Sequence, residues 1–268
     1  REGKMFGVLV VALSSVPAAA DYTEAAPVRP LTMSDLSGLS SVGLEFQLTK
    51  WTVRPPAPAP EVDLTSLTFD IAADIQLAPH WVLLGRLPIS HVTTDAADEC
   101  YDLALGNLTV GGRGLWSTLL QSGTRVVAGG ELSLSLPTAS DSGDRGLSSA
   151  GAALSHLAHD PGRYAPNTTT VRLTGLSQFY GKRFLAQAEL GMQLYFYDGD
   201  VVGDGVDLGM RLALAVGVRA TYKIAILAEL NTMLFFSDTF DGDNNTVTTL
   251  DLGLRYGLLC RPRRQVLD

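Results

Sequence analysis

The feature that most constrains this chain is the strict alternation of apolar and polar residues along 183–197, RFLAQAELGMQLYFY. Successive side chains of a β-strand point to opposite faces, whereas the helical period of about 3.6 residues mixes both sets on every face. The segment therefore predicts a strand with one wholly apolar face, formed by Phe184, Ala186, Ala188, Leu190, Met192, Leu194 and Phe196. It is longer than a usual soluble strand of about 5–6 residues and is typical of bilayer-spanning barrels, whose strands need about 9–11 residues.

Nine further segments alternate in the same way. Together the ten predicted strands are 42–53, 66–77, 81–90, 107–119, 125–136, 169–179, 183–197, 206–221, 224–236 and 246–259. The links between them alternate short and long, as in outer-membrane barrels with short periplasmic turns and longer extracellular loops. The first link is long, so both termini are expected on the periplasmic side.

This pattern predicts an all-β fold: a transmembrane, antiparallel, up-and-down β-barrel of about ten strands. A hairpin in the link 137–168, where 151–157 reads GAALSHL, would raise the count to twelve. The alternative is a soluble lipocalin-like barrel, whose apolar face would point inward.

Composition supports the membrane interpretation. Hydrophobic residues make up 46% of the chain, yet no run of 18 apolar residues is present to form a membrane helix. A barrel reconciles the two facts because its apolar residues are spread over alternate positions. The net charge of −8 argues against a nucleic-acid partner. The expected partners are outer-membrane lipid and a small solute; the sequence specifies neither the solute nor the oligomeric state.

Both ends of the chain carry segments outside the predicted barrel. Residues 1–20 join two early cations to the apolar stretch MFGVLVVAL and the small-residue stretch SSVPAAA, which predicts a cleaved secretory signal peptide. A buried N-terminal strand is the alternative. Residues 21–41 are expected to be a periplasmic lead-in, 42–260 the barrel and 261–268 a C-terminal tail.

The inward-facing positions of the predicted strands carry both signs of charge, and every base among them is Arg. The predicted lumen-lining residues are Glu45, Asp70, Asp74, Arg86, Arg113, Glu131, Arg172, Glu189, Arg211, Arg219, Glu229, Asp251 and Arg255. Arg suits a confined lumen because its planar fork pairs bidentately with carboxylates. Two interpretations stay open: an ion-pair network that fills a small barrel, or a polar conduit. About eight strands leave room for little more than side chains, and ten add some lumen.

No catalytic, metal or cofactor site is predicted. His156 and His159 have a spacing that suits metal ligation from a helix, but no third ligand stands out. A hydrolase would need a Ser or Thr nucleophile beside a His base, and no G-x-S-x-G elbow occurs. The chain is therefore not expected to be an enzyme.

Two segments resemble a known family. Residues 103–116 read LALGNLTVGGRGLW and residues 131–146 read ELSLSLPTASDSGDRG. They are similar to the LGD-x-x-LG-x-K/R strand and the LPTG segment of the outer-membrane channels linked to meta-pathway phenol degradation. Asn107 stands where that family usually has Asp, and Ala139 stands near its glycine. The resemblance implies a barrel of about twelve strands that passes small, often hydrophobic or aromatic, molecules.

These observations predict an outer-membrane barrel that acts as a passive channel for small molecules. The alternative is a closed, salt-bridged barrel with a structural or surface-interaction role. A lipid-modifying barrel enzyme is a third, more distant hypothesis.

Overall fold

The computed structural model describes residues 9–14, 33, 34, 36, 40–53, 62–94, 99–181, 183–198, 205–221, 224–236 and 246–256. Its elements are β1 (Leu9–Ser14), β2 (Ser41–Val53), β3 (Val62–Ala78), β4 (Trp81–Thr94), β5 (Glu99–Cys100), β6 (Ala104–Leu105), β7 (Thr109–Leu119), β8 (Arg125–Ser135), α1 (Gly143–Ser155), η1 (Pro161–Arg163), β9 (Thr168–Tyr180), β10 (Phe184–Tyr197), β11 (Gly205–Arg219), β12 (Ile224–Phe235) and β13 (Thr246–Tyr256).

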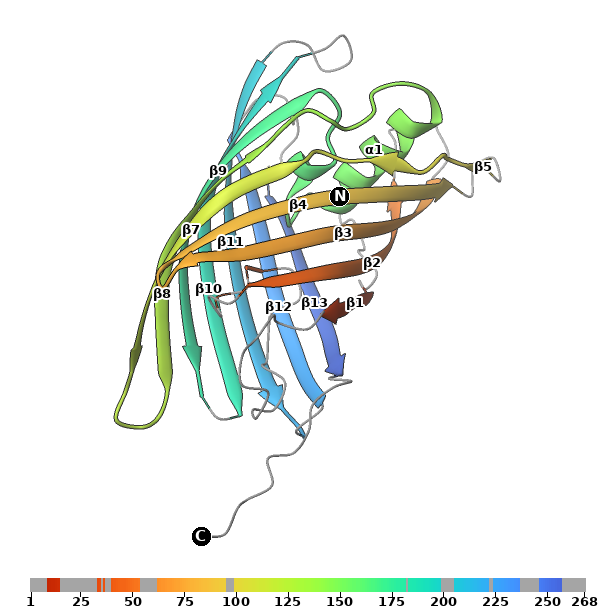
Figure 1. Cartoon of the computed structure of the whole chain (residues 1–268). Coiled ribbons are helices and arrows are strands. Elements are labelled where there is room, and N and C mark those ends of the chain that lie inside the picture. Colours follow the sequence, from red (N-terminus) through yellow and green to blue (C-terminus); the bar gives the residue numbers. More distant parts are fainter. Residues whose placement is uncertain are drawn as a thin grey trace.

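All strands belong to one antiparallel sheet in which neighbours in sequence are neighbours in space. The order is β1-β2-β3-β4-β7-β8-β9-β10-β11-β12-β13, and the short strands β5 and β6 pair back onto β4. Figure 1 shows this sheet curling strongly around its own concave face. The predicted up-and-down barrel is confirmed, because the ten predicted segments coincide with β2, β3, β4 and β7 to β13.

Strand β1 lies at the seam of the curl. It pairs with β2 from Leu9 opposite Leu48 to Ser14 opposite Gly43. Its Cα atoms also come within 8 Å of Cα atoms of β13, so β1 sits between the first and last predicted barrel strands. Residues of the predicted signal peptide thus form a strand in the full chain, and the cleavage of that segment stays a prediction.

The two faces of the sheet have opposite characters, as β10 illustrates. Leu190 and Met192 are 55% and 53% exposed on the convex face, whereas Glu189 and Gln193 are 2% and 0% exposed on the concave face. The direct register of β10 with β11, which places Leu190 opposite Leu212, continues the apolar face onto the next strand. The sheet is therefore polar inside and apolar outside.

The long link between β8 and β9 differs from the prediction. Residues 151–157, considered above for an extra hairpin, lie largely in helix α1, so the expectation of two more strands there is wrong. Small buried residues let α1 pack closely against the inner wall, among them Gly151, Ala152 and Ser155. A Cβ added to Gly151 would lie only 3.1 Å from a side-chain carbon of Val92 on β4. Figure 1 shows α1 beside β4, between the early and late strands of the curl. Among the described residues, no helix has both the length and the apolar character to cross a membrane.

The described residues of the predicted lead-in also lie inside the curl. Met33 is buried with Leu185, Ala213, Ala215, Ala225 and Leu227, at the end of the sheet where the short turns are. Leu36 is buried with Val82, Leu115, Val127 and Leu176 at the same end. An apolar layer therefore lies at the short-turn end of the interior.

Candidate functional site: the charged interior

The first charged layer joins the three wall strands β3, β7 and β8. Arg113 on β7 lies opposite Glu131 on β8 in the ladder, and its Nε and Nη2 donate to Glu131 Oε2 at 2.9 and 2.7 Å. Its Nη1 lies 3.6 Å from Asp74 Oδ2 on β3. Arg113 is 1% exposed, so its charge is held in the interior by two carboxylates. Removing one member of such a buried set leaves an uncompensated charge, which costs far more than an exposed pair is worth.

A second layer runs across β10 to β13. Arg211 Nη1 lies 3.3 Å from Glu189 Oε2, and Arg211 Nη2 donates to Asn231 Oδ1 at 2.7 Å. Asn231 Nδ2 in turn donates to Asp251 Oδ2 at 2.9 Å. These four residues form one hydrogen-bonded chain, in which the two carboxylates flank an arginine and an amide.

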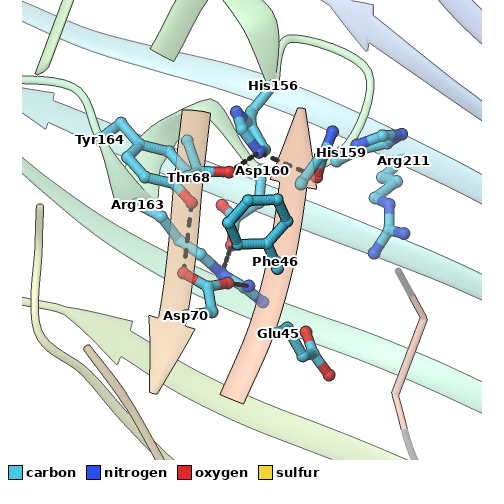
Figure 2. Close-up of a pocket in the computed structure, with 11 residues that line it drawn as sticks. Glu45, Phe46, Thr68, Asp70, His156, His159, Asp160, Arg163, Tyr164 and Arg211 are labelled. Atoms are coloured by element: carbon cyan, nitrogen blue, oxygen red, sulfur yellow. Dashed lines mark hydrogen bonds and ion pairs between the residues drawn. The ribbon is translucent and has the colours of Figure 1, made fainter. Parts of the chain in front are cut away.

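The link between β8 and β9 adds its own charged residues to this interior. Arg163 Nη1 lies 2.9 Å from Asp70 Oδ2 on β3, and Tyr164 Oη donates to Asp70 Oδ1 at 3.2 Å. Asp160 pairs with both Arg163 and Arg172. Figure 2 shows Asp70 between the side chains of Arg163 and Tyr164. Burial alone would raise the pKa of the Asp160 carboxyl, but the two arginines beside it lower that pKa below its usual value.

Two histidines of the same link reach the wall. His156 Nε2 lies 3.1 Å from Gln47 Oε1, and its Nδ1 lies 2.9 Å from the carbonyl oxygen of Ala152. Burial, and then the neighbouring His159, lower the pKa of His156 to about 4, so its ring is neutral at pH 7. His159 Nε2 lies 2.9 Å from Asp251 Oδ2, which ties the link to β13.

Asn107 holds the inward link in place from the wall side. Its Nδ2 donates to the carbonyl oxygens of Gly162, Ala165 and Thr168 at 2.8, 2.8 and 3.2 Å. Its Oδ1 accepts from the backbone N–H of Ala139 at 2.8 Å. The side chain is wholly buried, and only a carboxamide offers donors and an acceptor in one planar group of this size. The two segments that resemble the phenol-degradation channels therefore meet at this residue.

The lead-in is held by the same carboxylates that pair with the wall arginines. The backbone N–H of Ser34 donates to Glu189 Oε1 at 2.6 Å, and its hydroxyl donates to Glu131 Oε2 at 3.2 Å. Gln187 Nε2 donates to the Ser34 carbonyl oxygen at 2.8 Å. Ser34 thus bridges the two charged layers.

The structure places the predicted lumen-lining residues as follows. Those buried on the concave side are Asp70, Asp74, Arg113, Glu131, Arg172, Glu189, Arg211, Glu229 and Asp251. Glu45, Arg86 and Arg219 are partly exposed, and Glu45 lies 3.9 Å from Arg86. The side chain of Arg255 lies outside the described residues.

Sequence reasoning missed Asn107 on the wall side and three residues that the inward link contributes, namely Asp160, Arg163 and Tyr164. One sequence signal could have indicated them: residues 159–164, HDPGRY, combine charged and aromatic side chains directly after a run of small residues, in a link that was predicted to be an external loop. Among the described residues, no group of three or more His, Cys, Asp or Glu could hold a metal ion, so the spacing of His156 and His159 serves packing and hydrogen bonding.

The surroundings of His156 and His159 bear on whether either ring could act as a catalytic base. Ser155 Oγ lies 2.9 Å from His156 Nδ1, but it also donates to the carbonyl oxygen of Ala152, and Gln47 stands where an orienting acid would be needed. His159 has an acid partner in Asp251, yet its Nδ1 contacts no hydroxyl among the described residues. The geometry of a nucleophile, a base and an acid is not assembled here.

A small cavity of about 40 Å³ remains between the inward link and the wall. Figure 2 shows residues from β2, β3, β11 and the link converging on it. Its polar lining includes Glu45, Asp70, His159, Asp160, Arg163 and Arg211.

No protein-family model matches this chain, and no curated protein sequence is significantly similar to it. The resemblance to the phenol-degradation channels stays an expectation that rests on two segments.

Proposed function

We propose that this protein is an outer-membrane β-barrel that passes small molecules through its lumen, and that the conformation described here is closed. The observation that carries the membrane part is the inverted sheet: charged and amide side chains are buried inside, while large aliphatic side chains are exposed outside. Leu173, Leu214, Val216, Leu250 and Leu252 are among the exposed set. A soluble barrel has the opposite arrangement, because exposing a continuous apolar band to water is unfavourable.

Two segments that are separate from the wall support the passage of molecules. Met33 and Leu36 pack at the short-turn end, and the link with α1 fills the region beside β3, β4 and β13. A permanently closed barrel can fill its lumen with side chains of the wall alone. A separate segment that is held in the lumen by hydrogen bonds and ion pairs can move out of it and open a path. The lumen behind these segments is lined by charges of both signs.

The alternative is a closed barrel with a structural or surface-interaction role, and the extensive pairing of the interior charges favours it.

Conductance in planar lipid bilayers separates the two. We expect stepwise currents from the refolded protein, with longer open times in Arg163→Met, which loses the ties to Asp70 and Asp160. Arg145→Met is the matched control, because that side chain is exposed and its contact with Asp102 is long, at 3.9 Å. Absence of current from folded, membrane-inserted protein of both variants would establish the closed barrel.

The membrane location has its own test. Leu190→Lys places a charge on the convex face of β10 and should destabilise the inserted barrel by about 2–4 kcal/mol if that face contacts lipid near the midplane. Leu147→Lys is the control, because Leu147 is similarly exposed but lies on α1, away from the wall. Equal and small effects of the two substitutions on folding into vesicles would refute the membrane location.

A further inference from the structure

The cavity beside the inward link is lined by residues that hold buried polar atoms without a partner in the described part of the chain. These atoms are His159 Nδ1, Asp160 Oδ1 and Arg211 Nε, on residues that are 6%, 4% and 7% exposed. A buried polar atom without a partner carries a desolvation cost of about 1–3 kcal/mol, so such atoms normally meet a ligand or ordered water. Three of them on residues that line one cavity mark a built site.

The charges around the cavity are already matched within the protein. Asp70 and Asp160 pair with Arg163, Asp160 also pairs with Arg172, and Arg211 pairs with Glu189. Glu45, the most exposed of the lining carboxylates, lies 3.9 Å from Arg86. A ligand with a net charge would enter without a counter-charge, and its lost hydration would not be repaid. A molecule without net charge needs only the unsatisfied donors and acceptors.

We infer that this cavity is a binding site for small, uncharged, hydrogen-bonding solutes of the polyol type. Hydroxyl groups both donate and accept, so a polyol offers an acceptor to an N–H such as that of Arg211 and a donor to a carboxylate oxygen such as that of Asp160. The inference rests on the proposed function in one respect: it names the class of solute that the lumen passes most readily. It also departs from the hydrophobic or aromatic solutes that the sequence resemblance implies.

The test uses three molecules of nearly equal size that differ in charge. Glycerol is neutral, glycerate is anionic and 3-amino-1,2-propanediol is cationic at pH 7; benzyl alcohol represents aromatic solutes. Liposomes that contain the full-length protein are placed in each solute, and the swelling rate in excess of that of protein-free liposomes gives the rate of passage through the protein. Saturation-transfer NMR on the protein in detergent reports binding of the same solutes without requiring passage.

We expect glycerol to enter at least about tenfold faster than either charged analogue and to show the strongest saturation transfer. Arg211→Lys keeps the positive charge beside Glu189 but removes the Nε donor, and should weaken glycerol binding about tenfold, the effect of one lost hydrogen bond. Ser133→Ala is the control, because Ser133 is buried on the wall strand β8 and does not line the cavity. Glu45→Gln leaves Arg86 in excess and should raise the relative rate of glycerate.

The outcomes separate the inference from the proposed function. Passage of all solutes at equal rates, or preference for a charged or aromatic one, overturns the inference and leaves the channel proposal intact. No passage of any solute overturns the channel proposal, and saturation transfer to glycerol that Arg211→Lys reduces still establishes the site. If glycerol receives no transfer from the wild-type protein, the cavity holds water only and the inference is wrong.

Discussion

The substitution Asn107→Asp tests whether one amide holds the inward link in the lumen. In the native protein the amide donates to three backbone carbonyl oxygens, at 2.8, 2.8 and 3.2 Å. An ionised aspartate would turn an acceptor toward those oxygens, so the carboxyl must be protonated or the link must leave. Holding a proton at pH 7 on a group with a reference pKa of about 3.9 costs about 4 kcal/mol. The single O–H then replaces two N–H donors, which adds about 1–3 kcal/mol for the carbonyls left unsatisfied.

We therefore expect a loss of about 5–7 kcal/mol, or the whole free energy that holds the link inside, whichever is smaller. Urea unfolding followed by tryptophan fluorescence in detergent micelles gives the global value. Limited trypsin digestion reports release of the inward link alone, because Arg163 is mostly buried in the native link and becomes a cleavage site when the link leaves the lumen.

Gln121→Glu is the matched control for the same amide-to-carboxylate change. Gln121 lies exposed in the turn between β7 and β8, so its replacement should change stability by less than about 0.5 kcal/mol. The penalty of Asn107→Asp relative to wild type should also shrink by almost 4 kcal/mol at pH 4, because about half of the unfolded carboxyls already hold a proton there. If Asn107→Asp matched Gln121→Glu in stability and in its trypsin pattern, the role given to this amide would be refuted.

Three further predictions concern the same interior. The pKa of His156 is about 4 in the folded protein, against a reference value of 6.5, so between these pH values the unfolded chain binds a proton that the folded protein does not. The free energy of unfolding should therefore have its full value above pH 6.5, fall by about 3 kcal/mol toward pH 4 and stay level below that pH. The substitution His156→Gln should remove this slope in acid titrations. Gly162→Ala would bring a Cβ within 2.2 Å of Thr170 Oγ1 and should cost about 1–3 kcal/mol in urea unfolding. Arg113→Met leaves Glu131 buried without its guanidinium and should cost about 3–5 kcal/mol by the same measurement.

Each of these has an outcome that contradicts it. A pH slope that persists in His156→Gln would assign the acid sensitivity to other groups. Gly205→Ala, where nothing lies within 4 Å of the added Cβ, should be neutral, and an equal cost there would remove the steric reason for Gly162. A stable Arg113→Met protein would mean that water reaches the first charged layer.

Local alternation was sufficient to predict the wall. In β10 the identity of each residue determines which face it joins, because the strand period of two is a backbone property that needs no distant partner. The alternation therefore predicts that Glu189 points inward and Leu190 outward from the sequence alone. The same reasoning ordered the strands, since each short turn joins neighbours.

The contents of the barrel could not be predicted in this way. The described lead-in residues Met33, Ser34 and Leu36 and the link with α1 have no strand period. Their inward position depends on partners far away in sequence, such as Glu189 for Ser34 and Asp251 for His159. Asn107 illustrates the difference: its sequence neighbours indicate only a strand start, while its role comes from three carbonyl groups more than fifty residues later. The sequence by itself determined a sheet with a polar concave face, and the tertiary structure decided how that face is filled, because buried donors, acceptors and charges are satisfied by whichever segments the closed sheet brings within reach.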